Sequence, residues 1–316
     1  AFFGCCDITI ATRDANLGMA GPAMIAGGGL GEYAPEDIGP AEQQAAIGVI
    51  DILVDDEAEA VATAKRCLSY FQGPVADFEA PDSTRVADLM PANRRMTYDV
   101  RRIIAAIADI DSMTELGATH APNLVTAFIR VEGRPLGVIA NNPRSLAGAI
   151  DSAAARKAAD FMRLCNTHGI ALLTLCDTPG IMVGPEAEKS GTVAHASQLF
   201  IAGAKVAVPW YGIVLRKAYG LGAQAMLGGH LKRPNFTVAW PQGEFGPMGV
   251  EGAVTLGFRR ELEAIEDESE RAARYQQLVD SMYEQGKAEN VASYFEIDDV
   301  IDPGESRRWL AGALGS

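Results

Sequence analysis

Apolar runs alternate with amphipathic segments along most of the chain, and this alternation predicts an α/β fold. Residues 124–130 and 135–140 are two strand-like runs that flank Glu132-Gly133, a pair typical of a hairpin turn. Residues 151–168 then place apolar side chains at helical spacing, and residues 170–176 form an apolar run typical of a buried strand. Strands joined by crossover helices usually bind their ligands at the strand ends.

A strand, a glycine-rich turn and a short helix are predicted between residues 206 and 226. The apolar strand covers 206–215, and the turn contains Gly220 and Gly222 on either side of Leu221. The first amides of a helix have no partner within the helix, and the helix dipole favours an anion beside them. The turn could therefore hold an anion or a developing oxyanion. A strand-to-helix turn that merely needs glycine remains the alternative.

An internal repeat is predicted from two pairs of segments: residues 50–55 with 297–302, and Gly21-Pro22 with Gly246-Pro247. In the first pair a short apolar strand leads into an acidic helix start, and in the second a glycine-proline turn follows a strand. We expect two copies of one unit, with the first copy incomplete. The counterpart of the turn at Leu221 then maps upstream of Ala1.

The repeat suggests how the chain is divided. The polar run at residues 79–85 follows Gly73-Pro74 and is typical of a connection between units. We expect residues 1–80 to be the C-terminal remnant of the first copy, 81–96 to be a linker, and 97–316 to be the second copy.

Charge and composition narrow the possible partners. The chain of 316 residues has a net charge of -14 and a pI near 4.8, without a basic stripe, so no nucleic-acid partner is expected. No apolar run reaches the roughly 18 residues that a membrane span requires. Neither the five cysteines nor the histidines show metal-ligand spacing, so we expect no metal site and reduced thiols in the cytoplasm.

Several short motifs suggest other chemistry but lack the residues that it needs. Asp177-Thr178-Pro179-Gly180 has the D-x-x-G form of a GTPase, yet no phosphate-binding loop precedes it. His195 and Asp177 with Ser190 or Ser197 could form a triad, but the G-x-S-x-G elbow is missing. The run Gly27-Gly28-Gly29 is too short for a phosphate fingerprint; it suits a turn or a backbone that passes close to a ligand.

Motifs of a known family occur in four segments: Gly137–Pro143, Leu175–Gly180, Val214–Gly220 and Gly249–Val254. Together they resemble the carboxyltransferase (beta) subunit of biotin-dependent acyl-CoA carboxylases of the acetyl-/propionyl-CoA type. Residues 21–25 and 27–31 fit the end of that family's N-terminal lobe, so the resemblance covers essentially the whole chain. It implies a crotonase-like fold of ββα superhelical repeats in two homologous lobes, the first truncated here. It also implies a trimer or hexamer with each active site between lobes of different subunits.

The reaction implied by this resemblance moves a carboxyl group from carboxybiotin to the α-carbon of an acyl-CoA. Biotin would be carried by a biotin carboxylase or biotin carboxyl carrier partner. Each reactant passes through an oxyanion, and the resemblance assigns the backbone N–H groups of Leu221 and Gly222 to biotin. The pair for the thioester maps upstream of Ala1. No side-chain base is implied, because the released biotin takes the α-proton.

Other candidate binding residues are the turn residues and nearby cations, together with the glycine run: Gly220, Ala223, Gln224, Arg216, Lys217, Arg144, Gly27, Gly28 and Gly29. Gln224 stands where relatives that favour propionyl-CoA often carry aspartate, which leaves the acyl chain length open. The resemblance also leaves open a biotin-dependent decarboxylase subunit acting on malonyl- or methylmalonyl-CoA. A biotin-independent crotonase-type enzyme and an inactive assembly fragment are further alternatives.

Overall fold

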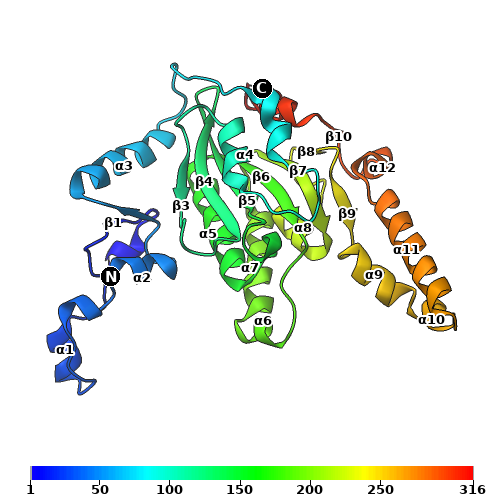
Figure 1. The fold of residues 1–316 in the computed structure, drawn as a ribbon. Helices are drawn as coiled ribbons and strands as arrows, with labels where there is room; N and C mark the ends of the chain where they lie inside the picture. The colour runs from blue at the N-terminus through cyan, green and yellow to red at the C-terminus, as the bar shows by residue number, and fades with distance from the viewer. Residues whose placement is uncertain (1, 316) are drawn as a thin grey trace.

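A mixed sheet of eight strands lies at the centre of the computed structural model, which describes residues 2–315 (Figure 1). The spatial order is β10-β8-β7-β6-β5-β4-β3, and β9 pairs with the end of β7. The strands are β3 (Thr114–Leu116), β4 (Leu124–Val131), β5 (Arg134–Asn141), β6 (Ala171–Thr178), β7 (Trp210–Tyr219), β8 (Phe236–Ala239), β9 (Glu244–Gly246) and β10 (Asp299–Val300).

The predicted hairpin and parallel strands are present. β4 and β5 pair antiparallel through a turn in which Glu132 and Gly133 adopt φ values of 50° and 73°. From β5 to β8 the strands run parallel, and every residue of β6 is buried. Burial of both faces explains why residues 170–176 lack polar alternation.

Helices cover both faces of the sheet. One face packs against α5 (Ser152–His168), α7 (Thr192–Lys205) and α8 (Gly220–Met226). The other face packs against α4 (Val100–Ile107) and α13 (Ser306–Gly315). α5 begins where the Asp151 side chain accepts the Ala154 N–H, and it ends at Gly169 with a φ of 69°. The predicted helix over 151–168 is therefore confirmed.

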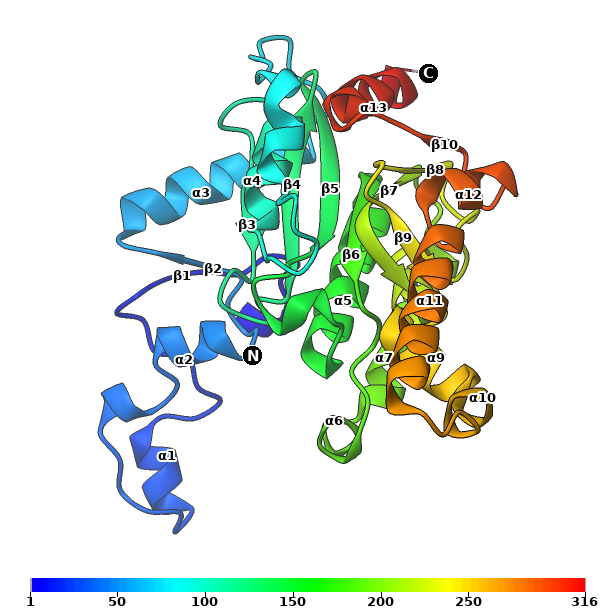
Figure 2. The ribbon, with the colours of Figure 1, turned by 45° about the vertical axis from the view of Figure 1, so that its right-hand side comes forward.

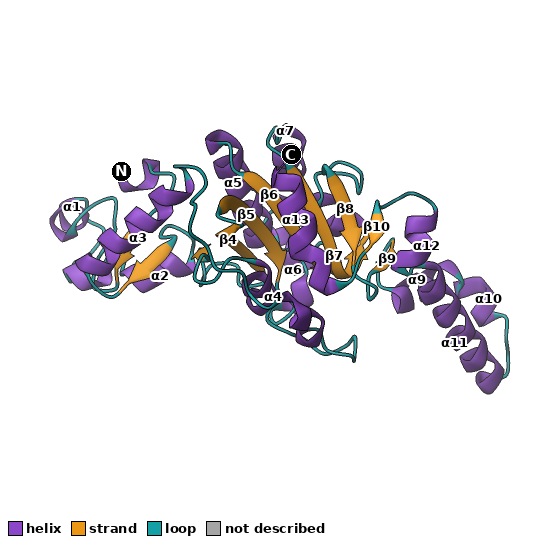
Figure 3. Cartoon of the chain, turned by 90° about the horizontal axis from the view of Figure 1, so that it is seen from above, coloured by secondary structure: helices purple, strands orange, loops and turns teal. Residues whose placement is uncertain are grey.

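Further helices extend away from the sheet at two opposite ends (Figure 3). One group follows β9: α9 (Val250–Gly257), α10 (Arg259–Glu263), α11 (Glu268–Gln285) and α12 (Ala288–Ser293). The other belongs to the N-terminal unit: α1 (Pro22–Gly27), α2 (Ala41–Ala46) and α3 (Glu57–Tyr70), with strands β1 (Ile10–Thr12) and β2 (Ile52–Val54). The remaining helical segments are η1 (Phe2–Cys5), η2 (Pro35–Asp37), η3 (Ser83–Leu89), η4 (Leu146–Gly148), α6 (Pro185–Lys189) and η5 (Pro303–Glu305).

Equivalent strand pairs carry the same hydrogen bond in both units. The Thr9 N–H donates to Asp51 Oδ2 at 2.8 Å beside the parallel pair β1-β2. The Thr237 N–H donates to Asp298 Oδ2 at 2.7 Å beside the parallel pair β8-β10. Ile10 and Ile52, which follow Thr9 and Asp51, form the first residue pair of β1 and β2. Val238 and Asp299, which follow Thr237 and Asp298, form the first pair of β8 and β10, so the two strand pairs share one register.

The loops after these strands repeat as well, and they correct one predicted match. The Leu17 N–H donates to Gly39 O at 2.7 Å, and the Phe245 N–H donates to Gly286 O at 2.8 Å. This register places Gly18 opposite Gly246, so the expected match of Gly21-Pro22 with Gly246-Pro247 is displaced by three residues. A glycine-proline pair suits many turns, which makes it a poor marker of register.

The N-terminal unit packs on the hairpin end of the sheet. The Tyr70 ring stacks on Phe128, and the Arg130 guanidinium donates to Ser69 O at 2.8 Å and to Gly73 O at 3.0 Å. The expected linker 81–96 is itself packed, because η3 buries Val86 against the second face of the sheet. The division into 1–80 and 97–316 stays a prediction, and its end points, residues 1 and 316, lie outside the described residues.

Candidate active site

Three loops meet at the carboxyl ends of the adjacent parallel strands β5, β6 and β7, and each carries a motif singled out in the sequence. The Ile150 N–H donates to Gly180 O at 3.0 Å, which ties the loop after β5 to the loop after β6. A Cβ at Gly222 would lie 2.6 Å from the Gly180 Cα, so the turn after β7 packs directly on the loop after β6. Carboxyl ends of parallel strands are the usual ligand edge of an α/β sheet.

The turn at Gly220 requires glycine for two reasons. Its φ is +54°, and a Cβ there would lie 2.5 Å from Pro247 O. The strand before it covers Trp210–Tyr219, so the predicted strand at 206–215 starts and ends too early. Pro209 has no N–H to donate, and the charged pair Arg216-Lys217 concealed the strand's continuation.

The first turn of α8 directs its outer side chains toward solvent. The Leu221 side chain is 62% exposed, and Gln224, which lies one helical turn later, is exposed as well. Gly222 and Ala223 are buried on the opposite side, where the Ala223 methyl joins the core. The assignment of Ala223 to the binding site stays a prediction, and a role there would fall to its backbone, because its methyl group is buried.

A buried carboxylate lies beneath the turn. Asp177 is fully buried, and its Oδ2 accepts the Tyr98 O–H at 2.7 Å and the Arg216 Nε–H at 3.1 Å. Burial and the adjacent Asp177 charge hold the pKa of Tyr98 well above its ordinary value, so the phenol keeps its proton. Arg216 Nη1 donates to Met96 O at 2.9 Å. The Arg216 side chain is 3% exposed and its guanidinium already pairs with Asp177, so its predicted role in ligand binding stays a prediction.

The other predicted cations lie near the same edge. Lys217 Nζ is 3.4 Å from Ala147 O and 3.7 Å from Asp177 Oδ1, so its ammonium lies between the loop after β5 and the end of β6. Arg144 is largely exposed, and its Nη1 lies 3.4 Å from Asp99 Oδ2. The glycine run Gly27–Gly29 is exposed at the end of α1, which lies far from β7, the strand that leads into α8 (Figure 2).

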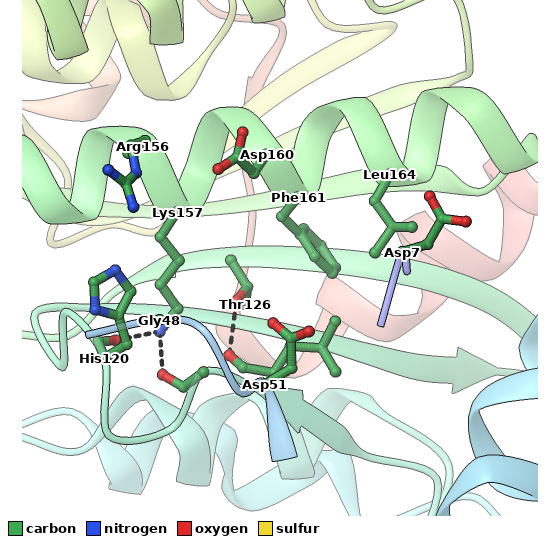
Figure 4. Close-up of a pocket in the computed structure, with 12 residues that line it drawn as sticks. Asp7, Gly48, Asp51, His120, Thr126, Arg156, Lys157, Asp160, Phe161 and Leu164 are labelled. Carbon is green, nitrogen blue, oxygen red and sulfur yellow. Dashed lines mark hydrogen bonds between the residues drawn. The ribbon is translucent and has the colours of Figure 1, made fainter. Parts of the chain in front are cut away.

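One cavity beside the loop after β5 and another at the N-terminal unit do not include the turn. One, of about 670 Å³, is lined by residues from several elements, among them Ser145, Leu146, Asp151, Ser190 and His195. The other, of about 110 Å³, lies between the N-terminal unit and α5 (Figure 4). There Lys157 Nζ donates to Gly117 O at 2.7 Å and to His120 O at 2.8 Å, with Asp51 nearby. Lys157 thus fastens the surrounding loops with its hydrogen bonds.

Residues 3–315 match the model of one protein family, described as the carboxyl transferase domain. The chain belongs to the carboxyl transferase domain family. It is 35% identical, over 98% of its length, to the methylmalonyl-CoA carboxyltransferase 12S subunit of Propionibacterium freudenreichii subsp. shermanii. It is 33% identical to the biotin-dependent acetyl-/propionyl-coenzyme A carboxylase beta6 subunit of Mycobacterium tuberculosis, again over 98% of the chain. The chain spans 60% of the first relative and 66% of the second.

Solved carboxyl transferase structures share the fold. A single-chain, multi-domain long-chain acyl-CoA carboxylase aligns with a TM-score of 0.90 and 50% identity, over 98% of this chain and 30% of that one. The transcarboxylase 12S hexamer, solved with methylmalonyl-coenzyme A bound, aligns with a TM-score of 0.88 and 34% identity, over 99% of this chain and 61% of that one. The predicted crotonase-like α/β fold is confirmed.

Sequence patterns alone did not reveal what Asp177 does in this carboxyl transferase domain. We considered it only as part of a D-x-x-G motif or a triad, whereas its carboxylate contacts Tyr98 and Arg216. Tyr98 lies 79 residues away in sequence, so only the fold brings the two together. The sequence did carry one signal for these contacts, namely a single acidic residue at the end of an apolar strand. A charge buried there needs hydrogen-bonding or ionic partners.

Proposed function

We propose that the protein transfers a carboxyl group from carboxybiotin to the α-carbon of an acyl-CoA thioester. The supporting observation is the α8 turn, where the backbone N–H groups of Leu221 and Gly222 begin a helix at the shared edge of three loops. Amides in that position have no partner within the helix and stabilise a developing negative charge. We assign them to the ureido oxygen of biotin, which becomes anionic when the carboxyl group leaves.

The acyl-CoA needs a second pair of amides, which we assign to the N-terminal lobe of another copy in a trimer or hexamer. Gly27–Gly29 lie in the N-terminal unit, far from α8 of the same chain, so they would act at a partner's site (Figure 1). Biotin would arrive on a biotin carboxylase or biotin carboxyl carrier partner. We assign this assembly to the cytoplasm, where buried thiols such as Cys165 and Cys176 stay reduced.

We propose that the acyl group extends to the long-chain class. The solved relative with 50% identity is a long-chain acyl-CoA carboxylase. The exposed side of α8 carries Leu221 and the neutral Gln224, and the exposed apolar residues Leu146 and Val183 lie on the two neighbouring loops. An apolar, uncharged surface suits an alkyl chain better than a short polar acyl group.

Three alternatives predict different outcomes of a turnover assay. A decarboxylase subunit would release carbon dioxide from malonyl- or methylmalonyl-CoA, and the same turn could serve that direction. A biotin-independent hydratase needs a carboxylate directed at its substrate, but Asp177 beneath the turn is fully buried and engaged by Tyr98 and Arg216. An inactive assembly fragment predicts no turnover in any direction.

The test compares two substitutions at Leu221 in the complete carboxylase, supplied with carboxybiotin and acyl-CoA substrates from acetyl to long-chain. Leu221→Pro removes one N–H donor at a position in the first helical turn that tolerates proline. We expect kcat to fall about 10²- to 10³-fold. Leu221→Ala keeps the N–H and should retain most of kcat. Equal rates for both variants, or no transfer to any acyl-CoA by the wild type, would reject the proposal.

A further inference from the structure

The strand β7 contains an irregularity directly opposite Asp177. Cys176 pairs with Val214, but Thr178 pairs with Ala218, so β7 has two more residues than β6 over this interval. Before the irregularity β7 pairs with β8, and after it β7 pairs with β9. A bulge of this kind bends a strand and redirects the segment that follows. Here that segment is the turn at Gly220.

The Asp177 side chain fills this bulge. Its Oδ1 accepts the Lys217 backbone N–H at 3.1 Å, a donor that an undisturbed β6-β7 ladder would pair with backbone. Its Oδ2 accepts the Tyr98 O–H and lies 3.1 Å from Arg216 Nε and 3.0 Å from Arg216 Nη2. The carboxylate therefore holds two consecutive residues of the bulge, one by its backbone and one by its side chain.

We propose that Asp177 is the positioning residue of the active site and sets the direction of the Leu221 and Gly222 amides. The path is short: Lys217 is separated from Gly220 by Ala218 and Tyr219 only, and the Tyr219 O–H donates to Glu244 Oε2 at 2.8 Å. Gly220 is confined by Pro247 O, and Gly222 rests on the Gly180 Cα. The Asp177 carboxylate thus fixes the start of the segment, these contacts limit its far side, and the geometry of the bulge passes to the amides over only a few residues. This inference rests on the proposed carboxyl transfer.

The experiment compares Asp177→Asn with a matched control in the complete carboxylase. The control is Asp109→Asn, because Asp109 is also buried, accepts two backbone N–H groups at Glu132 and Gly133, and pairs with buried Arg307. We expect Asp177→Asn to lower kcat about 10²-fold, as a 1 Å displacement of catalytic groups does, with the KM for acyl-CoA nearly unchanged. Asp109→Asn should retain kcat in the folded protein. Equal loss in both variants would overturn the inference.

Hydrogen exchange separates this inference from the proposed reaction. Amides of residues 216–219 should exchange about tenfold faster in Asp177→Asn than in the wild type or Asp109→Asn. If the wild type transfers no carboxyl group, the proposed function fails, and unchanged exchange would separately reject the positioning role. If Asp177→Asn does not fold, Tyr98→Phe decides, because it removes only one donor to the carboxylate. It should lower kcat severalfold at constant KM, and an unchanged kcat would refute the inference.

Discussion

Single glycines define the geometry of the active-site turn. Gly220 has both a left-handed φ and a carbonyl oxygen in the place of a Cβ, whereas Gly222 has only the close contact with Gly180. The sequence predicted a glycine-dependent turn at these positions, since few other residues allow it. The sequence could not predict which residues these glycines contact, because Pro247 and Gly180 come from separate loops.

Gly220→Ala should damage both stability and transfer. A Cβ in the left-handed region and against Pro247 O should lower the unfolding free energy by about 1 to 3 kcal/mol. Gly312→Ala in α13 is the control, because nothing lies within 4 Å of its added Cβ. That change should raise the unfolding free energy by about 0.5 to 1 kcal/mol. Denaturant titration measures both variants, and equal effects would contradict the assigned strain.

Lys157 should contribute a pH dependence to stability. Burial lowers its pKa from 10.5 to about 8, even though backbone carbonyls accept its hydrogen bonds. Between these values the unfolded chain binds a proton that the native protein has lost, so the unfolding free energy rises with pH. We therefore expect the unfolding free energy of the wild type, minus that of Lys157→Met, to increase from pH 8 to 10. A constant difference would show that the ammonium remains protonated in the native protein.

At the scale of elements, the repeat was predictable but its register was not. Apolar strands that lead into acidic helix starts identified both copies, because that pattern follows from burial and capping. Register depends on hydrogen bonds between segments distant in sequence, such as Thr9 with Asp51 and Thr237 with Asp298. The strand β7 was misjudged for the same reason, since Asp177 compensates the charge of Arg216 within it.

The repeated threonine–aspartate bond should stabilise the β8-β10 pair. Asp298→Ala leaves the Thr237 N–H and Lys232 Nζ without their acceptor, so the unfolding free energy should fall by about 1 to 3 kcal/mol. Asp299→Ala provides the comparison, because the Asp299 carboxylate is exposed and accepts the N–H of the neighbouring Val300. Its effect should stay within about 0.5 kcal/mol. Thermal and denaturant unfolding of both variants would test the difference.

At the scale of the whole molecule, strands β3 to β10 form a sheet with both faces covered by helices, and the N-terminal unit is fastened to one end of it. The expected linker is structured because Val86 and Met90 bury their side chains against the sheet. A polar composition suggested a free connection, but a few apolar residues were enough to pack it. None of the helices in residues 2–315 combines the length and apolar character needed to cross a membrane.

Arg130 should control how firmly the N-terminal unit is attached. Arg130→Met removes the hydrogen bonds to Ser69 O and Gly73 O, and we expect faster protease cleavage between residues 73 and 96. Arg134→Met changes a cation on the same hairpin and should be cleaved like the wild type. Limited proteolysis with mass spectrometry would follow both variants, and matching cleavage patterns would contradict the role of Arg130.

The repeated loop contacts also mark where the chain accepts a change of length. Gly39 and Gly286 accept equivalent hydrogen bonds from Leu17 and Phe245, yet the second copy places α9, α10 and α11 before its glycine. These helices have their own small apolar cluster, which includes Val254, Leu278 and Val279. The first copy spans the same gap with α1, a loop and the short helix η2. For protein engineers, the helices α9 to α11, which lie between Pro247 and Gly286, are therefore a natural site for trimming the protein or grafting a reporter domain.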